Sequence, residues 1–134
     1  MLSVIKRIIA FFSAIFALLG VGGRNAQTGR ADDLAWTIRD RSVVFEIPGN
    51  PTTGYAWTAE VDGDAVIPAG SDYRSDAHGN IGGAGGTYSF IFAAAKEGEA
   101  KITFIYARAW EDEPLRTVVV TVIADSDLHI TVQV

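Results

Sequence analysis

The sequence of 134 residues contains no cysteine, and this absence removes several classes of protein at once. Without a thiol the chain can form no disulfide, no thiolate nucleophile and no cysteine-ligated zinc site. Histidine is almost as scarce, because only His78 and His129 are present, and neither has a spaced partner that would make a catalytic triad or a metal site. The chain is therefore predicted not to be an enzyme and to need no metal or other cofactor.

Positive charge is also in short supply. The chain carries 11 Lys and Arg against 16 Asp and Glu, for a formal net charge of −5, and its basic residues are scattered. Nucleic-acid binding needs a basic stripe, so a nucleic-acid partner is not expected. The carboxylates of Asp62, Asp64 and residues 111–113 lie in turn-like segments, which favours solvated turns over a catalytic carboxylate pair.

One long apolar run stands at the N-terminus. Lys6 and Arg7 precede the uncharged run of residues 8–21, and glycines follow it, which is typical of a secretory signal peptide over residues 1–23. The alternative is an uncleaved anchor helix, although the run is short for a membrane span. Both interpretations predict an exported protein (secreted, periplasmic or in a vesicle lumen) that touches a membrane only if this segment is retained. Residues 24–33 are polar and aperiodic, and are predicted to form a linker.

From Leu34 onward the pattern is that of short strands. Strand-like patterns occur over 34–39, 42–47, 55–61, 88–94, 102–108 and 128–134, and residues 115–123 are the most β-prone run in the chain. A mixed stretch at 65–73 could hold a short strand, and residues 71–86 are loop-like. Seven or eight strands at this spacing predict one all-β domain over residues 34–134, an immunoglobulin-like antiparallel β-sandwich. The expected core aromatics are Trp36, Phe45, Trp57, Phe90, Phe104 and Tyr106.

The first loop of interest joins two of these strands and reads Asn50-Pro51-Thr52-Thr53-Gly54-Tyr55. Pro51 fixes its own φ, and Gly54 can take a positive φ without steric cost. The two threonines between them are stiff at χ1 because they are β-branched. The pattern predicts a rigid, protruding turn that offers hydroxyls, methyls and free backbone groups to a partner, with an ordinary chain-reversing loop as the alternative.

Two further loops stand out. The second reads Ile81-Gly82-Gly83-Ala84-Gly85-Gly86-Thr87, and its glycines would let a partner's main chain approach closely. A phosphate cradle would need a helix after the glycines, whereas residues 87–95 predict a strand, so the alternative is a flexible loop without function. The third loop, residues 108–114, places Trp110 beside Arg108 in an acidic turn, a composition common at interfaces. The alternative is that Trp110 folds back over the sandwich.

Together the three loops resemble the motifs of the chagasin-type inhibitors of papain-like cysteine proteases. That family has NPTTG followed by an aromatic residue, then GxGG, then RPW. This chain has residues 50–55, then Gly83-Ala84-Gly85-Gly86, then Arg108-Ala109-Trp110, in the same order and with similar spacing. The likeness covers nearly all of residues 34–123, and the family's immunoglobulin-like sandwich agrees with the strand pattern. Strand direction alternates in such a sandwich, so the loops are expected at one end.

The resemblance implies a monomeric, reversible, tight protein inhibitor of a papain-like cysteine protease. It places Thr52, Thr53 and Gly54 near the enzyme's cysteine, and the other two loops on either side of the cleft, with Trp110 against an aromatic surface of the enzyme. The contact residues it implies are Asn50, Pro51, Thr52, Thr53, Gly54, Tyr55, Gly83, Ala84, Gly85, Gly86, Arg108 and Trp110. Ala109 stands where the family usually has proline, so a less rigid third loop and weaker binding are expected.

Two other classes of function remain open at the level of sequence. One is an exported adhesion or carbohydrate-binding sandwich in which Trp110 and Tyr55 serve as stacking platforms. The other is a purely structural envelope domain. An assay of papain inhibition distinguishes the protease-inhibitor hypothesis from these two alternatives, because neither an adhesion module nor a structural domain would lower the rate of a protease.

Overall fold

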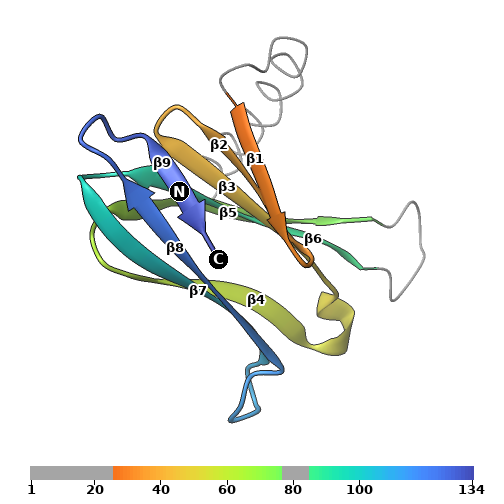
Figure 1. The fold of residues 1–134 in the computed structure, drawn as a ribbon. Helices are drawn as coiled ribbons and strands as arrows, with labels where there is room; N and C mark the ends of the chain where they lie inside the picture. Colours follow the sequence, from red (N-terminus) through yellow and green to blue (C-terminus); the bar gives the residue numbers. More distant parts are fainter. Residues whose placement is uncertain (1–25, 77–84) are drawn as a thin grey trace.

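The computed structural model describes residues 26–76 and 85–134, which form a sandwich of two antiparallel sheets (Figure 1). The first sheet has the strand order β1-β2-β3-β6-β5 and the second β4-β7-β8-β9. The first sheet consists of β1 (Ala26–Ala31), β2 (Leu34–Arg39), β3 (Ser42–Gly49), β6 (Gly86–Ala94) and β5 (Val66–Ser75). The second consists of β4 (Tyr55–Asp62), β7 (Gly98–Arg108), β8 (Arg116–Ala124) and β9 (Ile130–Gln133). The predicted all-β, two-sheet fold is confirmed.

The core lies between the sheets and is built around Phe45 of β3, which is fully buried. Its ring centroid lies 5.1 Å from that of Phe104 on β7 and 5.9 Å from that of Phe92 on β6, in tilted and edge-to-face arrangements. Of the predicted core aromatics, Phe45, Trp57, Phe90 and Phe104 are buried, while Trp36 and Tyr106 pack against the core from partly buried positions. Phe92, which is also buried, belongs to the same set.

Several boundaries differ from those predicted. Strand β7 begins at Gly98, four residues before its predicted start at Ile102. The linker prediction for residues 24–33 was wrong over 26–31, because Ala26–Ala31 pairs along its whole length with β2 as strand β1. The loop predicted over 71–86 is shorter, since β5 continues to Ser75 and pairs with β6. The last strand covers only Ile130–Gln133, because the residues before it form a turn. With β1 the described chain has nine strands, against the seven or eight predicted.

The predicted N-terminal segment 1–23 lies outside the described residues. Among residues 26–76 and 85–134 there is no helix long and apolar enough to cross a membrane. The helical structure in this part of the chain is one short 3-10 turn, η1 (Pro51–Thr53), between β3 and β4.

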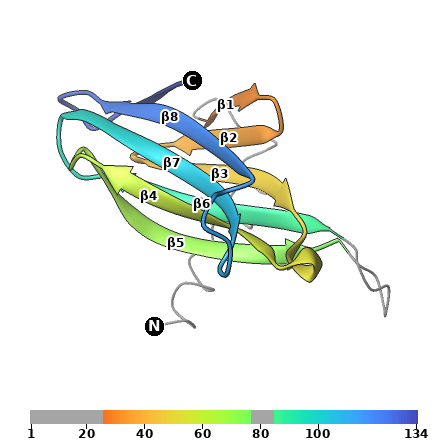
Figure 2. The same cartoon turned by 90° about the horizontal axis from the view of Figure 1, so that it is seen from below.

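Alternating strand direction gives the sandwich two distinct ends. One end, which we call the loop pole, carries five segments: the connection η1, the end of β5, the start of β6, the β7–β8 connection and the β1–β2 turn. The register shows this directly, since Gly49 pairs with Gly86 and Tyr55 with Arg108. The β8–β9 turn lies at the opposite pole, as Figure 2 shows.

Candidate protease-binding site

The first loop is a single 3-10 turn with both ends fixed. Asn50 caps its start: the side-chain Oδ1 accepts hydrogen bonds from the amide of Thr52 at 3.1 Å and from its hydroxyl at 2.6 Å. Gly54 ends it in the left-handed conformation at φ 87°, and its amide donates to the carbonyl of Pro51 at 3.0 Å. Pro51, Thr52 and Thr53 are exposed at the tip. The hydrogen bonds at both ends of the turn therefore account for the rigid, protruding shape that the sequence predicts.

The polar groups of this tip are less free than the sequence suggested. Both threonine hydroxyls donate inside the loop, that of Thr52 to the Asn50 side chain and that of Thr53 to the Asn50 carbonyl at 2.8 Å. The carbonyl of Thr53 accepts from Nε of Arg108 at 2.9 Å. What the tip offers a partner is therefore methyl groups, the pyrrolidine ring and hydroxyl oxygens that can still accept.

The third loop rests on the first. Trp110 is 71% exposed, yet its indole lies so close to Gly54 that a Cβ at this position would overlap the ring. Gly54 is thus required twice, for its positive φ and for this close approach. Trp110 does not fold back over the sandwich. The predicted convergence of the first and third loops is confirmed.

Arg108 joins the two loops at their base. Besides donating to the Thr53 carbonyl, its guanidinium lies 4.2 Å from the ring centroid of Tyr55 and 5.7 Å from that of Trp110, and it pairs with Glu111 at 3.0 Å. The Arg108 side chain is 33% exposed, and these contacts with both loops hold it in place. We therefore interpret Arg108 as a residue that holds the two loops together, and its predicted contact with a protease stays a prediction.

Stacked aromatic rings continue inward from Arg108. Tyr55 stacks on Tyr106 at 5.1 Å between centroids, and Tyr106 stacks on Trp57 at 4.8 Å. The Tyr106 hydroxyl accepts a hydrogen bond from the amide of Asn50 at 3.0 Å, and Nε1 of Trp57 donates to the Pro48 carbonyl at 3.0 Å. The stack therefore ties both ends of the first loop to the core.

The stack ends in an ion pair that crosses between the sheets. The guanidinium of Arg116, at the start of β8, lies 5.5 Å from the Trp57 ring and donates to both carboxylate oxygens of Asp33, at 2.5 and 2.6 Å. Asp33 lies in the β1–β2 turn. These hydrogen bonds from Arg116 hold the pKa of Asp33 below its usual value, against the opposing effect of burial.

The glycine motif of the second loop is only partly within the described residues. Gly83 and Ala84 lie outside them. Gly85 accepts a hydrogen bond from the amide of Asp76 at 3.0 Å. Gly86 is buried, and a Cβ there would overlap the Arg74 carbonyl and the Tyr73 side chain. The described glycines therefore serve the close packing of β5, β6 and β3 at the base of this loop.

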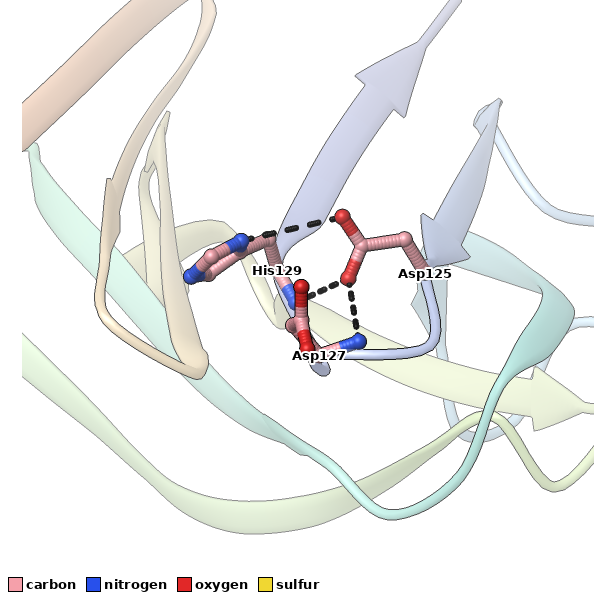
Figure 3. A group of neighbouring side chains, drawn as sticks. All are labelled: Asp125, Asp127 and His129. Carbon is pink, nitrogen blue, oxygen red and sulfur yellow. Dashed lines mark hydrogen bonds and ion pairs between the residues drawn. The ribbon is translucent and has the colours of Figure 1, made fainter.

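Three potential ligand side chains also gather at the opposite pole. Asp125, Asp127 and His129 place ligand atoms within 4.8 Å of one another, all exposed, in the β8–β9 turn (Figure 3). Oδ1 of Asp125 accepts from the amides of Asp127 and His129, both at 2.9 Å. These backbone hydrogen bonds, that from His129 foremost, lower the pKa of Asp125. They explain the grouping as a capped turn, and we assign no metal site here.

Several residues that shape the site were not singled out by the sequence analysis. Tyr106 was predicted as a core aromatic, whereas its hydroxyl also holds Asn50. Glu111 was read as a solvated acid, and Asp33 and Arg116 were not considered. Tyr106, Asp33 and Arg116 act through partners far away along the chain. Glu111 differs, because its partner Arg108 is three residues away and gave a local signal.

The fold and the loop pole together define a two-sheet β-sandwich that presents a capped tip and an exposed tryptophan side by side. The model of the chagasin family peptidase inhibitors, I42, matches residues 39–122, and the chain belongs to this family. β9 lies beyond the matched residues.

Two relatives from Entamoeba histolytica are similar to this chain. Amoebiasin-1 is 40% identical over 63 residues, which cover 46% of this chain and 60% of the relative. The chain thus spans less than two thirds of that protein. The crystal structure of the cysteine protease inhibitor EhICP2 matches with a TM-score of 0.51 and 28% identity, covering 58% of this chain and 73% of that one.

Proposed function

We propose that this protein is a reversible inhibitor of papain-family cysteine proteases, and that it occludes the catalytic cleft with loops 50–55, 82–87 and 108–114. Membership of the peptidase-inhibitor family and the likeness to a cysteine protease inhibitor of known structure support the class of target. The observation that carries the mechanism is the contact between Gly54 and Trp110, because it makes the tip and the tryptophan a single surface.

In this proposal the exposed tip enters the cleft and covers the enzyme's cysteine. The tip is a closed 3-10 turn with the Thr53 carbonyl held by Arg108, so it does not offer an extended peptide to the nucleophile. Its internal hydrogen bonds also mean that little conformational entropy is lost on docking, which favours tight binding. The inhibitor acts as an exported monomer, without metal or other cofactor.

The carbohydrate-binding alternative receives less support. It requires Tyr55 and Trp110 as free stacking platforms, but Tyr55 is stacked between Arg108 and Tyr106. Of the two residues, Trp110 is the one that is largely exposed, at 71%. We therefore propose no second function.

Titration of papain with the purified protein tests the proposal. The proposed inhibitor lowers the rate of peptide hydrolysis near one equivalent and is recovered intact. Thr53→Lys should abolish inhibition, because it places a long charged side chain on the exposed tip. Ser126→Lys is the matched control, since it adds the same charge to an exposed turn at the opposite pole. Undiminished papain activity with the wild-type protein, or equal effects of the two lysines, would contradict the proposal.

A further inference from the structure

The third loop begins with a tight turn whose geometry is well defined. The amide of Glu111 donates to the carbonyl of Arg108 at 3.2 Å, so residues 108–111 form a β-turn with Ala109 and Trp110 at its centre. A type II turn would need a positive φ at Trp110. Among the described residues the positive φ values of non-glycine residues belong to Asp32, Asp40 and Leu128, which leaves the type I turn.

Ala109 therefore occupies the position of a type I turn at which proline is favoured. Proline would fix φ at this position and reduce the freedom of the unbound loop. Arg108 ends strand β7, an extended conformation that a following proline tolerates. This chain has alanine at position 109, so no proline ring restrains the turn. Its turn must hold Trp110 in place by other means.

An ion pair spans the same turn. Nη1 of Arg108 lies 3.0 Å from Oε1 of Glu111, which joins the first and last residues of the turn through their side chains. The same guanidinium is fixed on its other side by the Thr53 carbonyl and the Tyr55 ring. Glu111 thus fixes the third loop to the Arg108 guanidinium, which also holds the first loop.

We propose that Glu111 is a positioning residue of the inhibitor, which restrains the turn that carries Trp110 where a proline at position 109 would otherwise do so. This inference rests on the proposed function for its effect on inhibition, but not for its effect on Trp110. Glu111 itself need not touch the protease. Its carboxylate acts through Arg108 and through the shape of the turn.

Kinetics of the full chain with papain test the effect on inhibition. Glu111→Gln should raise the inhibition constant about twofold to fivefold through faster dissociation, in keeping with the small contribution of a partly exposed ion pair. The decisive variant is Ala109→Pro: it should improve inhibition more in the Glu111→Gln background than in the wild type, because the two devices restrain the same turn. Asp64→Asn is the matched control, since it removes an exposed ion pair with Lys96 at the opposite pole.

A second measurement separates this inference from the proposed function. NMR relaxation of the Trp110 indole Nε1–H, assigned with Trp110→Phe, should show greater mobility in Glu111→Gln and a return to the wild-type value when Ala109→Pro is added. If wild-type protein leaves papain active, the proposed function fails, and the relaxation data alone decide on Glu111. If papain is inhibited but Trp110 mobility is unchanged in Glu111→Gln, or proline acts equally in both backgrounds, this inference is overturned and the proposed function stands.

Discussion

At the scale of single residues, the contact between the first and third loops depends on the absence of a Cβ atom at Gly54. Gly54→Ala should destabilise the protein by about 1–2 kcal/mol, because alanine is strained at φ 87°. It should also weaken papain inhibition by at least about tenfold, since the new methyl group must displace Trp110. Urea denaturation and the inhibition constant measure the two effects.

Gly63 provides the control for this prediction. It has a φ of 110° at the opposite pole, and a Cβ there would press on the backbone of Glu99. Gly63→Ala should therefore lower stability to a similar extent without changing inhibition by the folded protein. Equal losses of inhibition in the two variants would show that instability, rather than the displacement of Trp110, explains the effect at Gly54.

Tyr106 gives a second prediction at this scale. Tyr106→Phe keeps the ring stack but removes the hydroxyl that accepts from the Asn50 amide. We expect a loss of about 1 kcal/mol in the free energy of unfolding and a weaker inhibition of severalfold, because the first loop loses one of its anchors. Chemical denaturation combined with inhibition assays checks this. An inhibition constant that stays at the wild-type value would mean that the capping by Asn50 alone fixes the loop.

The roles of individual residues were only partly predictable from sequence. The turn residues Pro51 and Gly54 carry their conformational preferences with them, so the shape of the first loop could be inferred locally. The hydroxyl of Tyr106 could not be assigned, because its partner lies 56 residues away and is a backbone amide. The contacts of Arg108 with Thr53 and Tyr55 could not be foreseen from sequence, and its predicted contact with a protease stays a prediction.

At the scale of elements, the ion pair between Asp33 and Arg116 connects the β1–β2 turn to β8. Asp33→Asn should lower stability at neutral pH by about 0.5–1 kcal/mol, a modest effect because both side chains are about one third exposed. The folded-state pKa of Asp33 lies below its usual value of 3.8, so this stabilisation is complete above that value and is lost as the pH falls through the folded-state pKa. Urea denaturation of both proteins, at neutral pH and at about pH 3, should show the difference shrinking in acid. A constant difference would exclude the ion pair as its cause.

Strand β9 offers a test that separates stability from binding. Ile130 at its start is only 4% exposed, and β9 covers the edge of β8. Ile130→Ala should cost about 2–4 kcal/mol of folding free energy by leaving a cavity. Inhibition measured at a temperature where the variant is folded should be unchanged, because Ile130 lies toward the opposite pole. A large loss of inhibition in fully folded variant protein would show that the two poles are coupled.

Strand β4 has clearly alternating apolar residues and was predicted with nearly the right bounds, whereas the polar strand β1 was missed. β4 turns one face toward the core, so Trp57, Ala59 and Val61 alternate in sequence with more exposed residues. β1 is an edge strand with no buried residue, and its polar sequence AQTGRA carries no such signal. β5 was cut short in the prediction because its second half is polar, yet it pairs with β6 as far as Ser75.

At the scale of the whole molecule, the capped first loop and the aromatic stack beneath it lie at the loop pole of the sandwich. The capped β8–β9 turn lies at the opposite pole. The two-layer fold followed from the strand pattern, and the alternation of strand direction predicted loops at a common end. The direct contact between Gly54 and Trp110 did not follow from either, because it depends on how the sheets twist and pack. The division between the poles predicts that substitutions at the loop pole change inhibition and those at the opposite pole change only stability.

Chemical-shift mapping tests this central claim most directly. Isotope-labelled protein is titrated with papain whose catalytic cysteine has been replaced, so that binding is observed without turnover. The account predicts saturation at one equivalent, with the largest shifts in residues 50–55 and 108–114 and at the start of β6, and none in the β8–β9 turn. Shifts centred on residues 125–129, or no binding at all, would contradict it.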